Sequence, residues 1–306
     1  MKPRLAISFS GGRTSGYMLL HCLKEYGLTH DIVVTFANTG CEHPATLDFV
    51  HQCDKHIGGK VVWLEAVINP EAGVGVRHKI VTYETASRNG EPFEAFISKY
   101  GIPNSTNPNC TGRLKTDVME DYIKSLGWKR GVNIDYDTAI GIRADEVDRM
   151  SAKAAKYRFV YPLVKIGITK QMVIDFWKNQ PFDLRIPGEH YGNCVWCWKK
   201  TLRKLMTLSI ESPDVFDFPK RMEENYGHVK GYMKSGNGGK RVFFRKYMTV
   251  EDIFDKSKQP FEPYSENHQR FVGSCQISLF ENSWDNDLDI GSACGDSCEI
   301  GADENG

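Results

Sequence analysis

A Ser-Gly-Gly turn stands between an expected strand and an expected helix near the start of the chain, in Ser10-Gly11-Gly12-Arg13-Thr14-Ser15. Glycines let the backbone turn tightly and approach a ligand, and N–H groups at a helix N-terminus favour an anion. Three hydroxyls in the segment add donors. The segment lacks the Gly-x-Gly-x-x-Gly pattern of dinucleotide folds and the Gly-x-x-x-x-Gly-Lys-Ser/Thr pattern of NTPase loops. We therefore expect a phosphate loop of another kind.

The nine cysteines are the second set of residues that could do chemistry. Cys194 and Cys197 form a Cys-x-x-Cys pair, a spacing at which two thiolates can hold one metal or one edge of a cluster. Cys110 is a third candidate, and for the fourth ligand of a closed site we expect Cys275, with Cys294 or Cys298 as alternatives. The alternatives for the site are a [4Fe-4S] cluster, structural zinc and thiols without a metal.

The elements that must position these residues alternate between strand and helix. Apolar runs predict strands at 5–9, 31–36, 60–64 and 136–142, and helical spacing predicts helices at 15–27, 44–56, 92–100, 114–126 and 169–179. Such alternation with short turns predicts an α/β fold with a doubly wound, Rossmann-like, mostly parallel sheet. Ligands bind such sheets at the carboxyl ends of the strands, where the Ser-Gly-Gly turn lies.

Composition and charge narrow the class of protein. The 306 residues are 41% hydrophobic and 25% charged, as in a globular protein, and no apolar run approaches the roughly 18 residues of a membrane span. The first four residues lead straight into a strand-like run, so we expect no signal peptide, a cytoplasmic location and no disulfide framework. Residues 281–306 hold eight acids and no Lys or Arg, which leaves residues 1–280 with eight more basic than acidic residues. A cationic body suits a nucleotide or nucleic acid, or it is only a solvated surface.

Three regions are expected from these patterns. They are a nucleotide-binding α/β domain at 1–180, an accessory region with the Cys-x-x-Cys pair at 181–280, and an acidic, cysteine-containing tail at 281–306 whose composition predicts disorder.

Four segments, in the right order, resemble the phosphoadenosine phosphosulfate (PAPS) reductase family of the PP-loop adenine-nucleotide alpha-hydrolase superfamily, and similar short chains occur in phage genomes. That superfamily's loop is usually Ser-Gly-Gly-x-Asp-Ser. The reductases continue with Asp-Thr-Gly-x-x-Phe-Pro-Glu-Thr, Gly-x-Arg-x-x-Glu-Ser-x-x-Arg and Pro-Leu. The corresponding segments here are Ser10–Ser15, Phe36–Thr46, Gly141–Arg149 and Tyr161–Leu163, within residues 5–204. Thr14 and Asn38 stand where the family has Asp.

The resemblance implies a HUP-type fold and a nucleotide site. Residues 10–15 would cradle the phosphates of PAPS or ATP, with Mg²⁺ as an accompanying ion. Asn38 and Thr39 would lie beside the nucleoside. Gly141, Arg143 and Arg149 belong to the motif that neutralises phosphate or sulfate, for which arginine suits because its guanidinium binds such oxyanions bidentately.

The resemblance also bears on the cysteines. Iron–sulfur members of the family place cluster ligands at the positions of Cys110, Cys194 and Cys197. PAPS reductases end in Glu-Cys-Gly, a tail whose thiolate attacks sulfur and is then resolved by thioredoxin. Here Cys294 is followed by Gly295 and Cys298, so Cys294 would attack and Cys298 would resolve the disulfide. Acidic neighbours disfavour a thiolate, so the alternative is an incidental or cluster-ligating tail.

Three hypotheses for the function follow. The first is PAPS reduction to sulfite, with Cys294, Cys298 and Arg143 as catalytic residues and thioredoxin or glutaredoxin as partner. The second is an ATP-using sulfur transferase that adenylates and thiolates a nucleic acid, and the third is a non-catalytic nucleotide-binding module with structural zinc. We also expect a homo-oligomer and no membrane partner.

Overall fold

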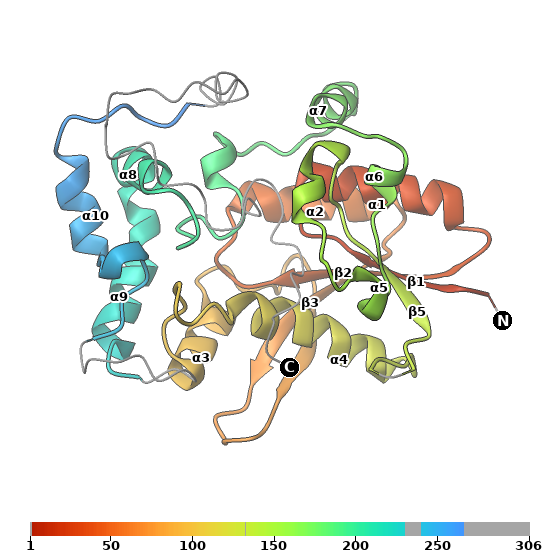
Figure 1. The fold of residues 1–306 in the computed structure, drawn as a ribbon, viewed down its shortest axis with the longest axis horizontal. Coiled ribbons are helices and arrows are strands. Elements are labelled where there is room, and N and C mark those ends of the chain that lie inside the picture. The colour runs from red at the N-terminus through yellow and green to blue at the C-terminus, as the bar shows by residue number, and fades with distance from the viewer. Residues whose placement is uncertain (1, 132, 230–239, 266–306) are drawn as a thin grey trace.

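The computed structural model describes residues 2–131, 133–229 and 240–265 and contains one six-stranded sheet (Figure 1). The strand order is β4-β3-β2-β1-β5-β6, and every neighbouring pair is parallel except β3 with β4. The strands are β1 (Arg4–Ser8), β2 (Asp31–Asn38), β3 (Val61–Ile68), β4 (Val76–Val81), β5 (Tyr136–Ala139) and β6 (Phe159–Val160). The predicted α/β class with a mostly parallel sheet is confirmed.

Helices cover both faces of this sheet and one of its ends. The α-helices are α1 (Arg13–Tyr26), α2 (Pro44–His56), α3 (Glu91–Tyr100), α4 (Asp117–Ser125), α5 (Ala154–Tyr157), α6 (Pro162–Lys165), α7 (Lys170–Lys178), α8 (Leu202–Glu211), α9 (Asp217–Tyr226) and α10 (Val250–Ser257). A π-helical turn η1 (Gly112–Thr116) precedes α4, and short 3₁₀ turns are η2 (Ala144–Arg149), η3 (Glu189–Tyr191), η4 (Pro213–Phe216) and η5 (Arg245–Tyr247). In Figure 1, α1, α2 and α7 lie on one side of the sheet, α3 and α4 on the other.

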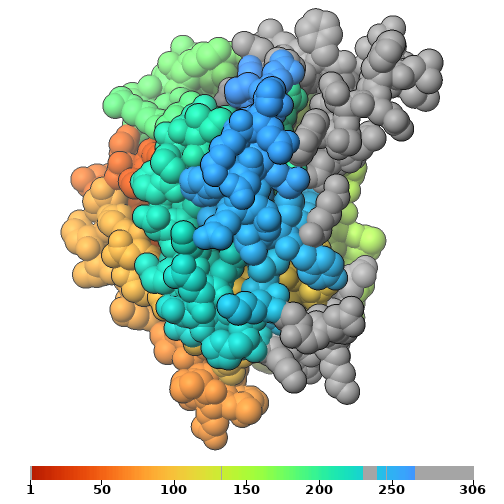
Figure 2. Space-filling view, turned by 90° about the vertical axis from the view of Figure 1, so that its left-hand side faces the viewer, coloured from red at the N-terminus to blue at the C-terminus, as the bar shows by residue number. Residues whose placement is uncertain are grey.

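The helices α8, α9 and α10 stand at the end of the sheet toward which β1 runs (Figure 1), and they form the face that Figure 2 turns to the viewer. Their apolar side chains belong to the same buried cluster as those of α3 and α4, whereas α1, α2 and α7 share a second cluster. The Cys-x-x-Cys segment lies in the first cluster. The accessory helices therefore share one buried core with α3, α4 and the Cys-x-x-Cys segment.

The strand order reverses at β1, which has β2 on one side and β5 on the other. The chain moves outward from β1 through β2 and β3, and later returns to add β5 on the opposite side of β1. In open α/β sheets the crevice at such a reversal, outside the carboxyl ends of the strands, is the usual ligand site. The turn after β1 holds Ser10–Ser15 and the segment after β5 holds Gly141–Arg149, so the topology brings the two predicted phosphate-binding segments together.

Several elements differ from the sequence-based expectation, among them β4, the start of α4 and α10. Strand β4 was not expected, because its Val-Arg-His-Lys-Ile-Val sequence is too polar for a buried strand; it is an edge strand, exposed over much of its length. The segment 114–126 begins earlier, as η1, and α10 forms on a Thr249–Asp252 capping box in a region where no helix was expected. The acidic tail at 281–306 lies outside the described residues, and the division into regions stays a prediction.

No helix among the described residues has both the length and the apolar character needed to cross a membrane.

Gly90 provides a test of how closely α9 packs against the sheet domain. It has a φ of +82°, and a Cβ there would lie 2.2 Å from a ring carbon of Phe218 on α9. Gly73 has a φ of +81° with no atom within 4 Å of its Cβ position, so Gly73→Ala reports the backbone strain alone. We expect Gly73→Ala to cost about 1–2 kcal/mol of stability, and Gly90→Ala to cost about 1–3 kcal/mol more from overpacking, measured by urea unfolding. Equal losses would show that α9 does not pack on Gly90.

Candidate functional site

The turn after β1 has the backbone features that the sequence-based prediction of an anion-binding loop requires. Gly11 has a φ of +83°, and a Cβ there would meet Thr46 at 2.8 Å and Val50 at 3.0 Å, so only glycine fits. Gly12 is the N-cap of α1, so no side chain of the N-cap residue bonds to the first N–H groups of the helix. The first turn of the helix holds no acidic residue. The hydroxyl of Ser10 donates to that of Ser15 at 2.9 Å. The first turn of a 14-residue helix therefore faces the reversal point of the sheet without a capping carboxylate.

The side chain of Arg143 extends from the segment after β5 to the loop after β1. Its guanidinium donates to the hydroxyl of Thr14 at 2.9 Å and also pairs with Asp145 and Glu146. Arg149 pairs with the same Glu146. The buried Arg143 side chain thus stands where a phosphate on the loop would be met, as the sequence motif implies.

Arg13 turns away from the loop, although it belongs to the predicted phosphate-binding segment. Its guanidinium binds both carboxylate oxygens of Asp183, at 2.7 and 2.9 Å, and donates to the carbonyl of Leu184 at 2.6 Å. The indole N–H of Trp177 donates to the Arg13 carbonyl. This side chain fastens α1 to the segment after α7.

Asn38 ends β2 and is fully buried. Its amide N–H₂ donates to the carboxylate of Glu65 and to the carbonyl of Ser87, each at 2.8 Å, and its carbonyl accepts from the N–H of Gly40. An Asp at this position would bring two carboxylates together. The amide therefore fits the buried acid on β3, a partner that the sequence did not reveal.

Glu42 organises the turn after β2. Its carboxylate accepts the Thr39 hydroxyl at 2.8 Å, the Thr39 backbone N–H at 3.0 Å and the Cys41 backbone N–H at 3.2 Å, and it pairs with Lys115 of η1 at 3.7 Å. Only 2% of the Glu42 side chain is exposed. The backbone of Glu42 also forms a bridge with that of Cys194. One buried carboxylate thus joins β2, the π-helical turn and the Cys-x-x-Cys segment.

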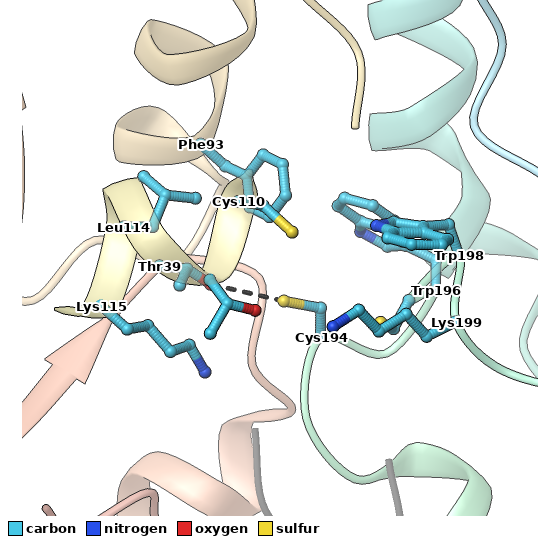
Figure 3. A pocket seen from close by; sticks show the side chains of 11 residues that line it. Thr39, Phe93, Cys110, Leu114, Lys115, Cys194, Trp196, Trp198 and Lys199 are labelled. Carbon is cyan, nitrogen blue, oxygen red and sulfur yellow. Dashed lines mark hydrogen bonds between the residues drawn. The ribbon is translucent and has the colours of Figure 1, made fainter. Parts of the chain in front are cut away.

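Cys110, Cys194 and Cys197 line one small, partly open cavity (Figure 3). Cys110 lies two residues before η1, and π-helical turns of this kind are frequent at functional sites. The hydroxyl of Thr39 lies 3.6 Å from the Cys194 sulfur. The structure therefore brings three of the four predicted metal ligands together beside the turn that follows β2; the fourth, Cys275, lies outside the described residues.

The apolar walls and charged rim of the cavity suit an anionic metal group. Phe93, Leu114, Trp196 and Trp198 form walls, and Lys115 and Lys199 also line it. The indole N–H of Trp198 is buried and has no hydrogen-bond partner among the residues that the structure describes. Leaving such a donor without an acceptor costs about 1–3 kcal/mol, which an acceptor in the cavity would recover. Three thiols, two ammonium groups and an orphaned donor are a donor set that fits a thiolate-bound cluster.

The three cysteines are not grouped as the ligands of one metal ion would be. In the described part of the chain, no three His, Cys, Asp or Glu side chains are grouped to hold one ion. Zinc requires all its thiolates about 2.3 Å from one point, whereas a cluster spreads them over separate iron atoms.

Lys200 fixes the Cys-x-x-Cys segment from within the protein. Its side chain is buried, and its ammonium group donates to the carbonyls of His190, Cys194 and Val195 at 2.5–3.1 Å. The Cys197 backbone N–H donates to the Cys194 carbonyl at 2.9 Å, closing the turn between the two thiols. A buried lysine three residues after Cys197 has no distinct sequence signal, since a lysine is usually exposed.

The remaining described cysteines are core residues. Burial raises the pKa of Cys22 to about 12 and that of Cys53 further, so both stay thiols on helix faces, as expected. Burial, with Cys194 and Glu42 nearby, raises the pKa of Cys41 well above its usual range. Cys294 and Cys298, the predicted redox pair, lie outside the described residues and stay predictions.

Comparisons with known proteins give one near full-length relative. No protein-family model matches the chain. The uncharacterized nin region protein ORF290 of Escherichia phage lambda is 32% identical over 300 residues, covering 96% of this chain and 94% of that protein. The uncharacterized protein MJ0066 of Methanocaldococcus jannaschii is 26% identical over 161 residues, 53% of this chain and 27% of its own length. Neither name states an activity.

Among solved structures, the U34-tRNA thiolase NcsA from Methanococcus maripaludis with its [4Fe-4S] cluster aligns with 86% of this chain and 83% of its own. The identity is 15% and the TM-score is 0.34.

Asn38→Asp tests the contact between β2 and Glu65. Two buried carboxylates in contact raise the pKa of the pair in the folded state above the ordinary value near 4 of the unfolded chain. The stability of the variant is therefore retained below about pH 4 and lost as the pH rises through the raised pKa, reaching a loss of about 3 kcal/mol at pH 7. Urea unfolding at several pH values measures this. The exposed Asn69→Asp is the matched control, and a pH-independent loss in Asn38→Asp would contradict the contact.

Lys200→Met tests the support of the Cys-x-x-Cys segment. The change leaves three buried carbonyls without the ammonium donor, so we expect a stability loss of about 3 kcal/mol and faster alkylation of Cys194 and Cys197. Lys199→Met, which removes an ammonium group 5.6 Å from the Trp198 ring centre, is the control and should cost less than about 1 kcal/mol. Peptide-resolved alkylation rates provide the readout; equal rates in the two variants would rule out this role of Lys200.

Proposed function

The chain belongs to the family of the phage lambda nin region protein ORF290, and we propose that it is an ATP-dependent sulfur transferase with a [4Fe-4S] cluster. The observation that carries the proposal is the placement of two sites at one edge of the sheet. The anion-binding loop follows β1, the three-thiol cavity adjoins the turn after β2, and these strands are direct neighbours. In this proposal nucleotide chemistry and sulfur chemistry would take place at the ends of neighbouring strands.

The nucleotide half rests on the loop and on Arg143. The N-terminus of α1 offers backbone donors to the phosphates, and Arg143 stands over Thr14 with a guanidinium that can exchange its hydroxyl partner for a phosphate oxygen. Because Thr14 is uncharged, it does not repel the triphosphate, and the phosphate charge would be balanced by Arg143 and an accompanying Mg²⁺.

The sulfur half rests on Cys110, Cys194 and Cys197, which would hold the cluster. Lys115 and Lys199 would offset its negative charge, and the aromatic walls would limit the access of water. The bound cluster supplies a site that carries sulfur to the target. With three described thiols, a fourth iron would be left for that sulfur or for a ligand from the remainder of the chain.

The overall reaction balances with ATP and a sulfide donor. An oxygen of the target attacks the α-phosphorus of ATP, a new O–P bond forms and pyrophosphate leaves. Sulfide sulfur then forms a bond to the activated carbon or phosphorus, and AMP departs with the oxygen. The net charge of residues 1–280, eight more basic than acidic residues, favours a nucleic acid as the target.

Reduction of PAPS to sulfite is the second candidate. It is favoured by the four segments that resemble PAPS reductases and by the two thiols of the tail, Cys294 and Cys298. In that reaction the Cys294 thiolate attacks the sulfuryl sulfur, the nucleotide leaves, and Cys298 or an external dithiol such as thioredoxin releases sulfite by forming a disulfide. The two candidates share the nucleotide loop and differ in the thiol that they require.

Anaerobically purified protein loaded with iron and sulfide separates the two candidates. With ATP, Mg²⁺, sulfide and host tRNA we expect pyrophosphate release and thionucleosides detectable by mass spectrometry. Cys110→Ser should lose the cluster and thiolation while keeping pyrophosphate release, Arg143→Gln should reduce pyrophosphate release about 10²-fold, and Cys294→Ser should retain both activities. Sulfite from PAPS that disappears in Cys294→Ser would instead establish the reductase. Absence of both products from loaded protein would overturn both candidates.

A further inference from the structure

The indole of Trp198 is placed unlike that of another deeply buried tryptophan. Trp177 is 1% exposed and its N–H donates to the carbonyl of Arg13 at 2.8 Å. Trp198 is 2% exposed, yet its N–H has no acceptor among the residues that the structure describes. Native proteins pair the great majority of buried donors, so a donor left over beside a cavity indicates that its acceptor is bound there.

The position of Trp198 is well supported by its surroundings. It directly follows Cys197 in the sequence. In Figure 3, Cys110 lies between Leu114 and Trp198. The ammonium group of Lys199 lies 5.6 Å from the centre of its ring, and the carbonyl of Lys199 accepts from the guanidinium of Arg245 at 2.6 Å. The backbone next to the indole is thus held in place.

We infer that the indole N–H of Trp198 donates a hydrogen bond to a sulfur atom of the group that Cys110, Cys194 and Cys197 hold, an inference that rests on the proposed function. The cavity walls consist of apolar side chains, thiols and cations. Two described acceptors nearby already accept hydrogen bonds: the Thr39 hydroxyl from the Cys41 backbone N–H and the Cys194 carbonyl from Lys200. Thiolate and sulfide sulfurs accept hydrogen bonds and carry the negative charge that an N–H group stabilises.

A hydrogen-bond donor to sulfur affects the cluster in a way that an aromatic side chain without a donor does not. Hydrogen bonds to the sulfurs of an iron–sulfur cluster are among the factors that set its reduction potential, because they stabilise the more negative, reduced state. Phenylalanine in place of Trp198 keeps an aromatic wall and removes the donor. The reduction potential therefore distinguishes hydrogen bonding from shielding.

The test compares wild type, Trp198→Phe and Trp196→Phe after anaerobic loading with iron and sulfide. Trp196 lines the same cavity, so its variant reports the loss of the same ring atoms from a neighbouring wall. The reduction potential is measured by titration followed by electron paramagnetic resonance, and the nitrogen coupling of the reduced cluster is measured in protein labelled with ¹⁵N at the indole. Iron content and unfolding curves establish that each variant is folded and loaded.

We expect Trp198→Phe to have a more negative potential than wild type and to lose the indole ¹⁵N coupling, while Trp196→Phe keeps both. If Trp198→Phe does not take up a cluster, the indole ¹⁵N coupling of the other two proteins decides. A coupling that is present in wild type and retained in Trp196→Phe supports the inference, and the absence of the coupling from wild type overturns it. Loaded Trp198→Phe with an unchanged potential and coupling also overturns it, leaving the proposed function intact. A wild-type protein that takes up no iron and sulfide overturns both.

Discussion

The buried carboxylate of Glu42 is the interaction on which the geometry of the site depends. Burying an ionised carboxylate is costly unless every oxygen is hydrogen-bonded or paired. Glu42 meets this condition only because Thr39, the Cys41 N–H and Lys115 come to it from the end of β2 and from the π-helical turn, while its backbone bridges to Cys194. Satisfying one charge therefore sets the relative positions of the three segments that surround the thiols.

The polar groups around the thiols share one physical pattern. Lys200 is buried and donates hydrogen bonds to backbone carbonyls beneath the Cys-x-x-Cys turn. Lys115 is paired with Glu42, and the Trp198 N–H has no described acceptor. A region designed only for stability would be filled with apolar side chains, since buried charges and unmade hydrogen bonds both cost free energy. Local departures of this kind concentrate where a protein binds or reacts, which agrees with an anionic group in the cavity.

The sequence predicts the parts of the molecule that depend on local pattern. Apolar periodicity identifies β1, β2, β3, α1 and α2, and the Ser-Gly-Gly pattern identifies the tight turn after β1, where Gly11 needs both a positive φ and the absence of a Cβ. Spacing alone also identifies Cys194 and Cys197. The contacts that build the site are not local: Glu65 lies 27 residues from Asn38, and Cys194 lies 155 residues from Thr39. A buried Lys200 and the orphaned Trp198 donor become visible only when the burial of each atom is known.

The measurement that tests the central claim most directly is a crystal structure of the anaerobic, iron-loaded protein with a non-hydrolysable ATP analogue, with anomalous diffraction recorded at the iron edge. We expect iron between Cys110, Cys194 and Cys197, and the analogue's phosphates on the backbone of residues 10–15 beneath Arg143. Zinc on a single point among these thiols, or a nucleotide bound away from the reversal point between β1 and β5, would contradict a sulfur transferase built on this edge of the sheet.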